Sequence, residues 1–198
     1  MNILCNSPKT EISVKNSRFI AQAFSAESPE SAKEIVRSQK ERYKDARHIV
    51  HAFIVGANAE ISGMSDDGEP SGTAGRPILD VLKGSGITNI LITVVRYFGG
   101  TLLGTGGLCR AYSESAKNVI SLCHTELLVE KLRFELTADY ALYEGLKRLW
   151  KNFHLSDLTE NFDSQVRVSG FLWKNESEDF FLNTKNFSKG MCTVKFFD

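Results

Sequence analysis

Residues 87–112 read ITNILITVVRYFGGTLLGTGGLCRAY and combine three patterns in one run. The apolar segment from Ile87 to Phe98 predicts a strand that is buried on both faces of a sheet. A glycine-rich loop follows at 99–107, and beyond it apolar residues recur at helical spacing from Leu108 to Cys123. A strand, a glycine loop and a helix in this order can hold an anion against the unpaired N–H groups of the helix N-terminus.

The glycine loop matches neither of the two nucleotide-binding motifs that its spacing suggests. Gly99 and Gly104 are spaced as in a P-loop, but Thr105 and Gly106 stand where that motif needs lysine and then serine or threonine. A dinucleotide fingerprint starting at Gly104 fails because its third glycine position is Cys109. The loop therefore either binds an anion or only allows a sharp turn and close packing. The candidate ligand-binding residues of this region are Arg96, Tyr97, Gly104, Gly106, Gly107 and Arg110.

A second loop, SDDGEPSGTAGRP at 65–77, carries three carboxylates within four residues. Oxygen ligands of this kind suit a hard cation such as Mg²⁺, whereas glycine N–H groups and an arginine at a helix start suit a phosphate. The other interpretation is that the carboxylates accept backbone N–H bonds in a rigid loop. We favour it over a metal site because the full calcium-loop pattern is absent. The candidate residues are Asp66, Asp67, Glu69, Ser71, Thr73 and Arg76.

Two histidines on a predicted strand, His48 and His51, lie three residues apart. Such residues face opposite sides of a strand, so the two imidazoles cannot share one metal ion without distortion. A hydrogen-bonding role is the simpler interpretation of each, and His48 is kept as a ligand-binding candidate.

Basic residues gather between Lys33 and Arg47, where six cations face three carboxylates. This excess is typical of a solvated helix end and is a weak indication of RNA contact. The candidate nucleic-acid-binding residues are Arg37, Lys40, Arg42, Lys44 and Arg47.

Composition sets the remaining limits. The chain has 198 residues, 42% hydrophobic and 24% charged, which predicts a globular protein with a real core. Its 24 basic residues balance 24 acidic ones, which excludes a protein that coats nucleic acid through bulk charge. We find no apolar run near the ~20 residues of a membrane span and no secretory signal at 1–6. The four cysteines lack metal-ligand spacing, so we expect a cytoplasmic protein with reduced thiols, no structural metal and no cofactor.

The periodicity changes near residue 126 and divides the chain into predicted domains 1–126 and 127–198. The first mixes strands, at about 11–24, 46–55 and 87–98, with a helix that Ser28 and Pro29 begin and a short helix at 80–83. Residues 56–77 are expected to be a loop. The second domain has the order β-α-β-β-α-β, the ferredoxin-like plan. The fold class is therefore α+β in two domains.

The strings SDDGEPSGTAGRP (65–77) and VRYFGGTxLGTGGLxRAY (95–112), with SRFIA (17–21) and AxHxxxA (46–52), resemble the signature of the Impact/YigZ family. The resemblance implies an N-terminal domain similar to the second domain of ribosomal protein S5 and a ferredoxin-like C-terminal domain. That pairing is similar to domains four and five of the ribosomal translocase elongation factor G. The eukaryotic relatives are linked to translational control by the amino-acid-starvation kinase pathway.

These observations leave three functional hypotheses. The leading one is a non-catalytic accessory factor of translation that binds structured RNA or the ribosome. The second is an enzyme or nucleotide-binding protein whose two loops hold a phosphate-bearing small ligand, with the carboxylates on a metal and Arg76 and Arg96 on the phosphate. The third is a protein-interaction module in which the loops are rigid for shape alone.

Overall fold

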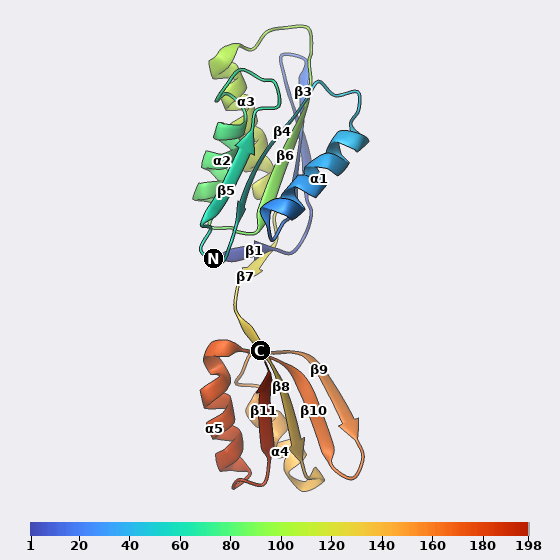
Figure 1. Ribbon diagram of the computed structural model, residues 1–198, viewed down its shortest axis with the longest axis vertical. Coiled ribbons are helices and arrows are strands. Elements are labelled where there is room, and N and C mark those ends of the chain that lie inside the picture. Colours follow the sequence, from blue (N-terminus) through green and yellow to red (C-terminus); the bar gives the residue numbers. More distant parts are fainter. Residues whose placement is uncertain (198) are drawn as a thin grey trace. The chain divides into compact units, whose positions relative to one another are not determined.

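The computed structural model describes residues 1–197, and its contacts divide the chain after Leu128 into two compact units (Figure 1). Both units combine helices with antiparallel sheets, so the protein belongs to the α+β class. None of the described helices is long and apolar enough to span a membrane.

The first unit is built on a five-stranded antiparallel sheet in the order β2-β3-β6-β4-β5. The central strand, β6 (Ile90–Tyr97), pairs with β3 on one side and β4 on the other, and all but its last residue are buried. The prediction of a strand buried on both faces is confirmed. The other strands are β2 (Lys9–Val14), β3 (Ser17–Ser25), β4 (His48–Val55) and β5 (Ile61–Ser65).

Helices cover both faces of this sheet. One face carries α2 (Gly75–Gly84) and α3 (Gly104–Ile120), and the other carries α1 (Pro29–Arg42) (Figure 1). As predicted, α1 begins after Ser28, whose side chain accepts the N–H of Ser31 in a capping box.

Three sequence predictions for this unit were wrong in their bounds. The expected strand at 11–24 is a hairpin of β2 and β3, because Lys15 and Asn16 take left-handed backbone angles and turn the chain. The expected loop at 56–77 contains the edge strand β5. The short helix expected at 80–83 is the end of α2, which already begins at Gly75.

A two-stranded ribbon joins the ends of the first unit. β1 (Asn2–Leu4) pairs antiparallel with β7 (Thr125–Leu127), and β7 includes the position, 126, at which we expected the domain boundary.

The second unit follows the predicted β-α-β-β-α-β order. Its antiparallel sheet runs β11-β8-β10-β9, the fourth, first, third and second strands of the unit. Both helices contribute to a single core on one face of the sheet. The elements are β8 (Lys131–Ala138), α4 (Tyr140–Trp150), β9 (Leu155–Phe162), β10 (Val166–Trp173), the 3-10 turn η1 (Lys174–Glu176), α5 (Ser177–Phe187) and β11 (Thr193–Phe197).

Candidate anion-binding site

The two glycine loops of the first unit meet at a pocket of about 360 Å³. Polar groups reach it from three directions, because β4 begins, β6 ends and α3 begins at its rim. The lining residues are Arg47 and His48, the loop segment Gly68–Pro70, Arg96 and Phe98 from the end of β6, and Leu102–Thr105 with Leu108 around the start of α3.

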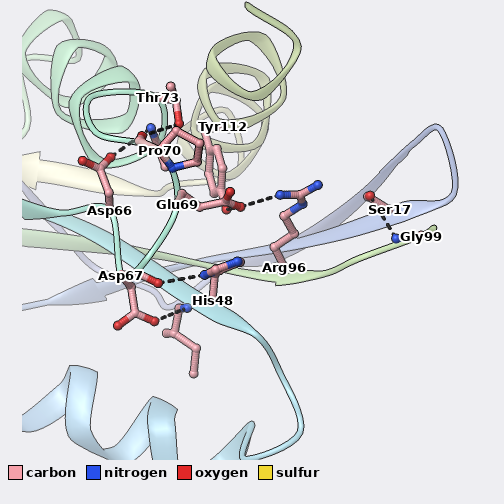
Figure 2. A network of polar contacts seen from close by, with 12 residues as sticks. Ser17, His48, Asp66, Asp67, Glu69, Pro70, Thr73, Arg96, Gly99 and Tyr112 are labelled. Carbon is pink, nitrogen blue, oxygen red and sulfur yellow. Dashed lines mark hydrogen bonds and ion pairs between the residues drawn. The ribbon is translucent and has the colours of Figure 1, made fainter. Parts of the chain in front are cut away.

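A buried ion pair forms the floor of the site (Figure 2). Arg96 Nη1 donates to Glu69 Oε1 at 2.6 Å, and the hydroxyl of Tyr112 donates to the same oxygen at 2.8 Å. The side chains are only 7% and 3% exposed, so a substitution that removes one charge leaves the other unpaired in a dry environment. Burial, followed by the nearby Glu69 carboxylate, raises the pKa of Tyr112, which therefore stays a hydrogen-bond donor.

Arg96 has a buried donor that no described residue satisfies. Its Nε is buried and has no hydrogen-bond partner among residues 1–197. Its guanidinium lies 5.5 Å from the ring centroid of Phe19 and 5.7 Å from that of Phe98, so two aromatic rings hold its orientation. A buried donor without a partner costs free energy unless a ligand or water satisfies it.

The N-terminus of α3 is open. Leu103, the residue before the helix, has no polar side chain, and the first turn contains no acidic residue. In the part of the chain that the structure describes, no side chain caps the first N–H groups of this 17-residue helix. Gly104 begins the helix with a φ of +72°, a conformation that favours glycine. The helix dipole and the uncapped N–H groups at this helix start suit an anion.

The N-terminus of α2, in contrast, is already filled by the protein itself. Asp66 Oδ1 accepts the N–H groups of Ala74 at 3.0 Å and Gly75 at 2.8 Å, and its Oδ2 accepts the N–H of Gly72 at 2.9 Å. Burial raises the pKa of the Asp66 carboxyl, but these three backbone donors outweigh it and lower the pKa below its ordinary value. The prediction of an oxyanion site at this helix start, with Arg76, is wrong because a carboxylate occupies it.

Asp67 also has a structural role. Its carboxylate accepts hydrogen bonds from Lys40 Nζ at 2.6 Å and from the backbone N–H of Ile49 at 2.7 Å. Its carbonyl oxygen lies 2.8 Å from His48 Nδ1 (Figure 2). Burial raises the pKa of Asp67, yet the hydrogen bonds from Lys40 and Ile49 produce a net lowering. This carboxylate fastens the loop to β4.

The three loop carboxylates therefore do not form a metal site. Asp66 turns to the start of α2, Asp67 to Lys40 and β4, and Glu69 to Arg96 and Tyr112. Within residues 1–197 no group of three or more acidic, histidine or cysteine side chains converges on one point. The metal ligands of the second hypothesis are corrected accordingly, since each carboxylate is committed to a different partner.

Several other candidates lie away from the pocket. Arg76 pairs with Asp80 at 2.8 Å, one turn further along α2, and does not line the pocket. Thr73 donates its hydroxyl to the Pro70 carbonyl at 2.6 Å. Tyr97 donates its hydroxyl to Asp45, and Arg110 donates to the Gly106 carbonyl. Ser71 is exposed and Gly107 is half-buried.

The candidate nucleic-acid-binding residues between 37 and 47 also lie mostly outside the pocket. Only Arg47 lines the pocket, and it is exposed. Lys40 is committed to Asp67, Arg37 pairs with Glu41, and Arg42 lies over the ring of Tyr43. The exposed Lys44 lies near Arg47 in the chain.

The sequence carries no signal for the apolar wall of the pocket or for the role of Tyr112. Phe98, Leu102 and Leu108 flank the cationic groups, so the site offers a surface for a flat, apolar group beside an anion. Tyr112 is buried on α3, within the stretch of helical apolar spacing, but its contact with Glu69 spans 43 residues and has no local signal.

The fold and this pocket define a two-unit α+β protein whose first unit presents an uncapped helix start beside a buried arginine. The family model of the Impact N-terminal domain matches residues 15–120, more than half of the chain. The chain belongs to the IMPACT family.

Similar proteins agree along most of the sequence. An IMPACT family member of Haemophilus influenzae is 37% identical over 160 residues, 80% of this chain and 78% of that protein. IMPACT family member YigZ of Escherichia coli is 34% identical over 179 residues, 89% of this chain and 88% of that protein. A crystal structure described as that of a hypothetical protein matches 100% of this chain and 97% of its own, with a TM-score of 0.67 and 31% identity.

Proposed function

We propose that this protein is an accessory factor of translation that binds structured RNA and holds one of its phosphates at the start of α3. The observation that carries the proposal is that an uncapped helix start and a buried arginine line the same pocket. The N–H groups of α3 have no cap, and the buried Nε of Arg96 has no partner among the described residues. The implied link of the family to translation supports the choice of RNA.

The electrostatics of the pocket suit a phosphodiester. The charge of Arg96 is balanced by Glu69, so the net positive charge at the rim comes from Arg47 and the helix dipole. A site of this kind attracts one phosphate and gives modest, salt-sensitive affinity. The neutral overall charge of the chain is consistent with recognition at a few points rather than along a basic surface.

The walls of the pocket suit the rest of a nucleotide. Phe98 and Leu102, which are 44% and 83% exposed, line the pocket beside the cationic groups. A base or ribose next to the bound phosphate would cover them. RNA that presents an unpaired nucleotide is therefore the favoured ligand.

A free phosphate-bearing small molecule is the second candidate, favoured by the pocket volume of about 360 Å³, which falls in the size range of ligand pockets. With the loop carboxylates committed to backbone and cations, this protein would bind such a molecule without a carboxylate-held metal.

The test uses two substitutions at one exposed rim position. Thr105→Asp places a carboxylate in the first turn of α3, where it competes with the phosphate, whereas Thr105→Asn has the same size and no charge. We expect an RNA hairpin with an unpaired loop to bind the wild type at low salt, and Thr105→Asp to weaken this binding by about tenfold or more. Thr105→Asn should stay within about twofold.

Two controls sharpen the result. Arg47→Ala should weaken binding, while Arg37→Ala, which removes an exposed cation away from the pocket, should not. Stabilisation by a free nucleotide but by no RNA would favour the small-ligand candidate. Equal RNA binding by Thr105→Asp and Thr105→Asn would contradict the proposed site.

A further inference from the structure

The sheet of the second unit has one face without helices. Both α4 and α5 pack on the other face, where Phe134, Leu136, Val166 and Val168 form the core. The residues between them point away from that core because side chains alternate along a strand. On β8, β10 and β11 these outward residues are partly or fully exposed. We call this surface the open face.

A row of aromatic and cationic side chains crosses the open face. Arg133 on the second strand of the sheet pairs directly with Phe171 on one side and with Phe197 on the other. The two rings are 38% and 41% exposed, and the Arg133 guanidinium lies 5.8 Å from the centroid of Phe197. With one strand between them, the two rings are roughly 10 Å apart across the sheet. Each ring can therefore take its own planar partner.

The next aromatic residue on the open face already has such a partner. The imidazole of His154 stacks flat on Trp173, with ring centroids 3.6 Å apart and planes within 6°. Trp173 follows Phe171 by two residues on β10, so both lie on the same face. This contact is an example, within the protein, of a planar group stacked on a ring of the open face.

Cations outnumber carboxylates on the three strands β8, β10 and β11 of the open face. The charged residues that face outward on β8, β10 and β11 are Lys131, Arg133, Arg167 and Lys195, against the single carboxylate Glu135. Among the described residues, Glu135 forms an ion pair with Arg133 at 2.8 Å and lies opposite Lys195 in the strand register. Exposed rings among cations that outnumber this carboxylate match a ligand with planar groups on an anionic backbone, and they do not match a basic protein surface.

We infer that the open face binds single-stranded RNA, with bases stacked on Phe171 and Phe197 and phosphates held by Arg167 and Lys195. The inference takes RNA as the partner from the proposed function, but the surface is separate from the pocket at α3 and can be tested independently. Four-stranded antiparallel sheets with exposed aromatics bind single-stranded RNA in this way, since every base offers a face for stacking.

The experiment compares binding of fluorescent dodecamer oligouridine to the full chain and to variants. Phe171→Ala and Phe197→Ala should each weaken binding by about fivefold or more, the loss expected for one stacked base. Phe171→Tyr, which retains an aromatic face, should bind within about twofold of the wild type. Circular dichroism checks that each variant remains folded.

Phe181→Ala is the matched control. Phe181 is 42% exposed on α5, and Lys185 lies over its ring at 5.9 Å, so it resembles Phe197 with its arginine but sits away from the open face. We expect its removal to leave oligouridine binding unchanged. The inference is overturned if Phe171→Ala and Phe197→Ala behave like Phe181→Ala, or if the wild type does not bind oligouridine.

The same variants separate this inference from the proposed function. Loss of oligouridine binding in Phe171→Ala, with hairpin RNA binding insensitive to Thr105→Asp, supports the open face and contradicts the pocket. The reverse pattern supports the pocket and contradicts the open face.

Discussion

The helices α2 and α3 both begin at a glycine-rich loop on the same face of the first sheet, yet their N-termini are satisfied differently. Asp66 reaches back from the preceding loop and accepts three N–H groups at the start of α2. No described side chain does this for α3, where Arg96 also keeps a free donor. The comparison teaches that a glycine loop before a helix is not by itself a ligand site. A helix start is a candidate ligand site only where no side chain of the protein accepts its N–H groups.

The largest expected effect comes from the buried arginine beside α3. Arg96→Met leaves the Glu69 carboxylate buried without its cation, so we expect a loss of about 3–5 kcal/mol in the free energy of unfolding. Arg133→Met breaks an exposed ion pair in the second unit and should cost less than about 1 kcal/mol.

Denaturant unfolding separates the two results. Both tryptophans, Trp150 and Trp173, lie in the second unit, so fluorescence follows that unit while circular dichroism follows both. A loss for Arg96→Met as small as that for Arg133→Met would mean that the buried ion pair does not hold the pocket.

A smaller effect is expected in the pH dependence of stability, which reports on Asp66 as the cap of α2. The pKa of Asp66 in the folded protein lies below its ordinary value of 3.8, so the folded state binds fewer protons than the unfolded state under mildly acidic conditions. Its contribution is therefore complete above about pH 4 and is lost as the pH falls through the lowered pKa. Asp66→Asn should be less stable by about 1 kcal/mol at neutral pH and should lose less stability on acidification.

Thermal unfolding between neutral pH and about pH 3 measures this difference. Asp80→Asn, an exposed carboxylate one turn along the same helix, is the control. Parallel stability curves for the wild type and Asp66→Asn would show that Asp66 does not cap α2.

The smallest expected effect comes from a variant that places a negative charge at the start of α3, as Asp66 does at the start of α2. Thr105→Asp adds a negative charge to the first turn of α3, so it should raise stability by about 0.3–1 kcal/mol over Thr105→Asn. The melting temperatures of the two variants at low salt measure it. A lower value for Thr105→Asp would indicate that the helix start is not electropositive.

The sequence predicts those parts of the fold whose signals are local. The apolar run identifies β6, Ser28 and Pro29 identify the start of α1, and alternation identifies the strands of the second unit. The strand β5 was missed because its sequence, ISGMS, lies at the sheet edge and has little apolar pattern. The early start of α2 was missed because its cap, Asp66, lies eight residues before Ala74.

The pocket was predicted only in part. The sequence places both glycine loops and Arg96 among the candidates, since these carry visible chemistry. The sequence does not show which carboxylates are already hydrogen-bonded within the protein, because Glu69 bonds Arg96 across 27 residues and Tyr112 across 43. The sequence also does not show that Arg76 lies outside the pocket, where it pairs with Asp80, or that Asp66 caps the helix start beside it.

The central claim, that the start of α3 receives a phosphate of RNA, is tested most directly by amide NMR. Addition of the hairpin RNA to labelled protein should shift the N–H signals of 104–107 and the side-chain Nε–H signal of Arg96, and Thr105→Asp should abolish these shifts. The N–H signals of Gly72, Ala74 and Gly75, already held by Asp66, should change little. Signals of 104–107 that stay unchanged while RNA binds elsewhere would contradict the claim.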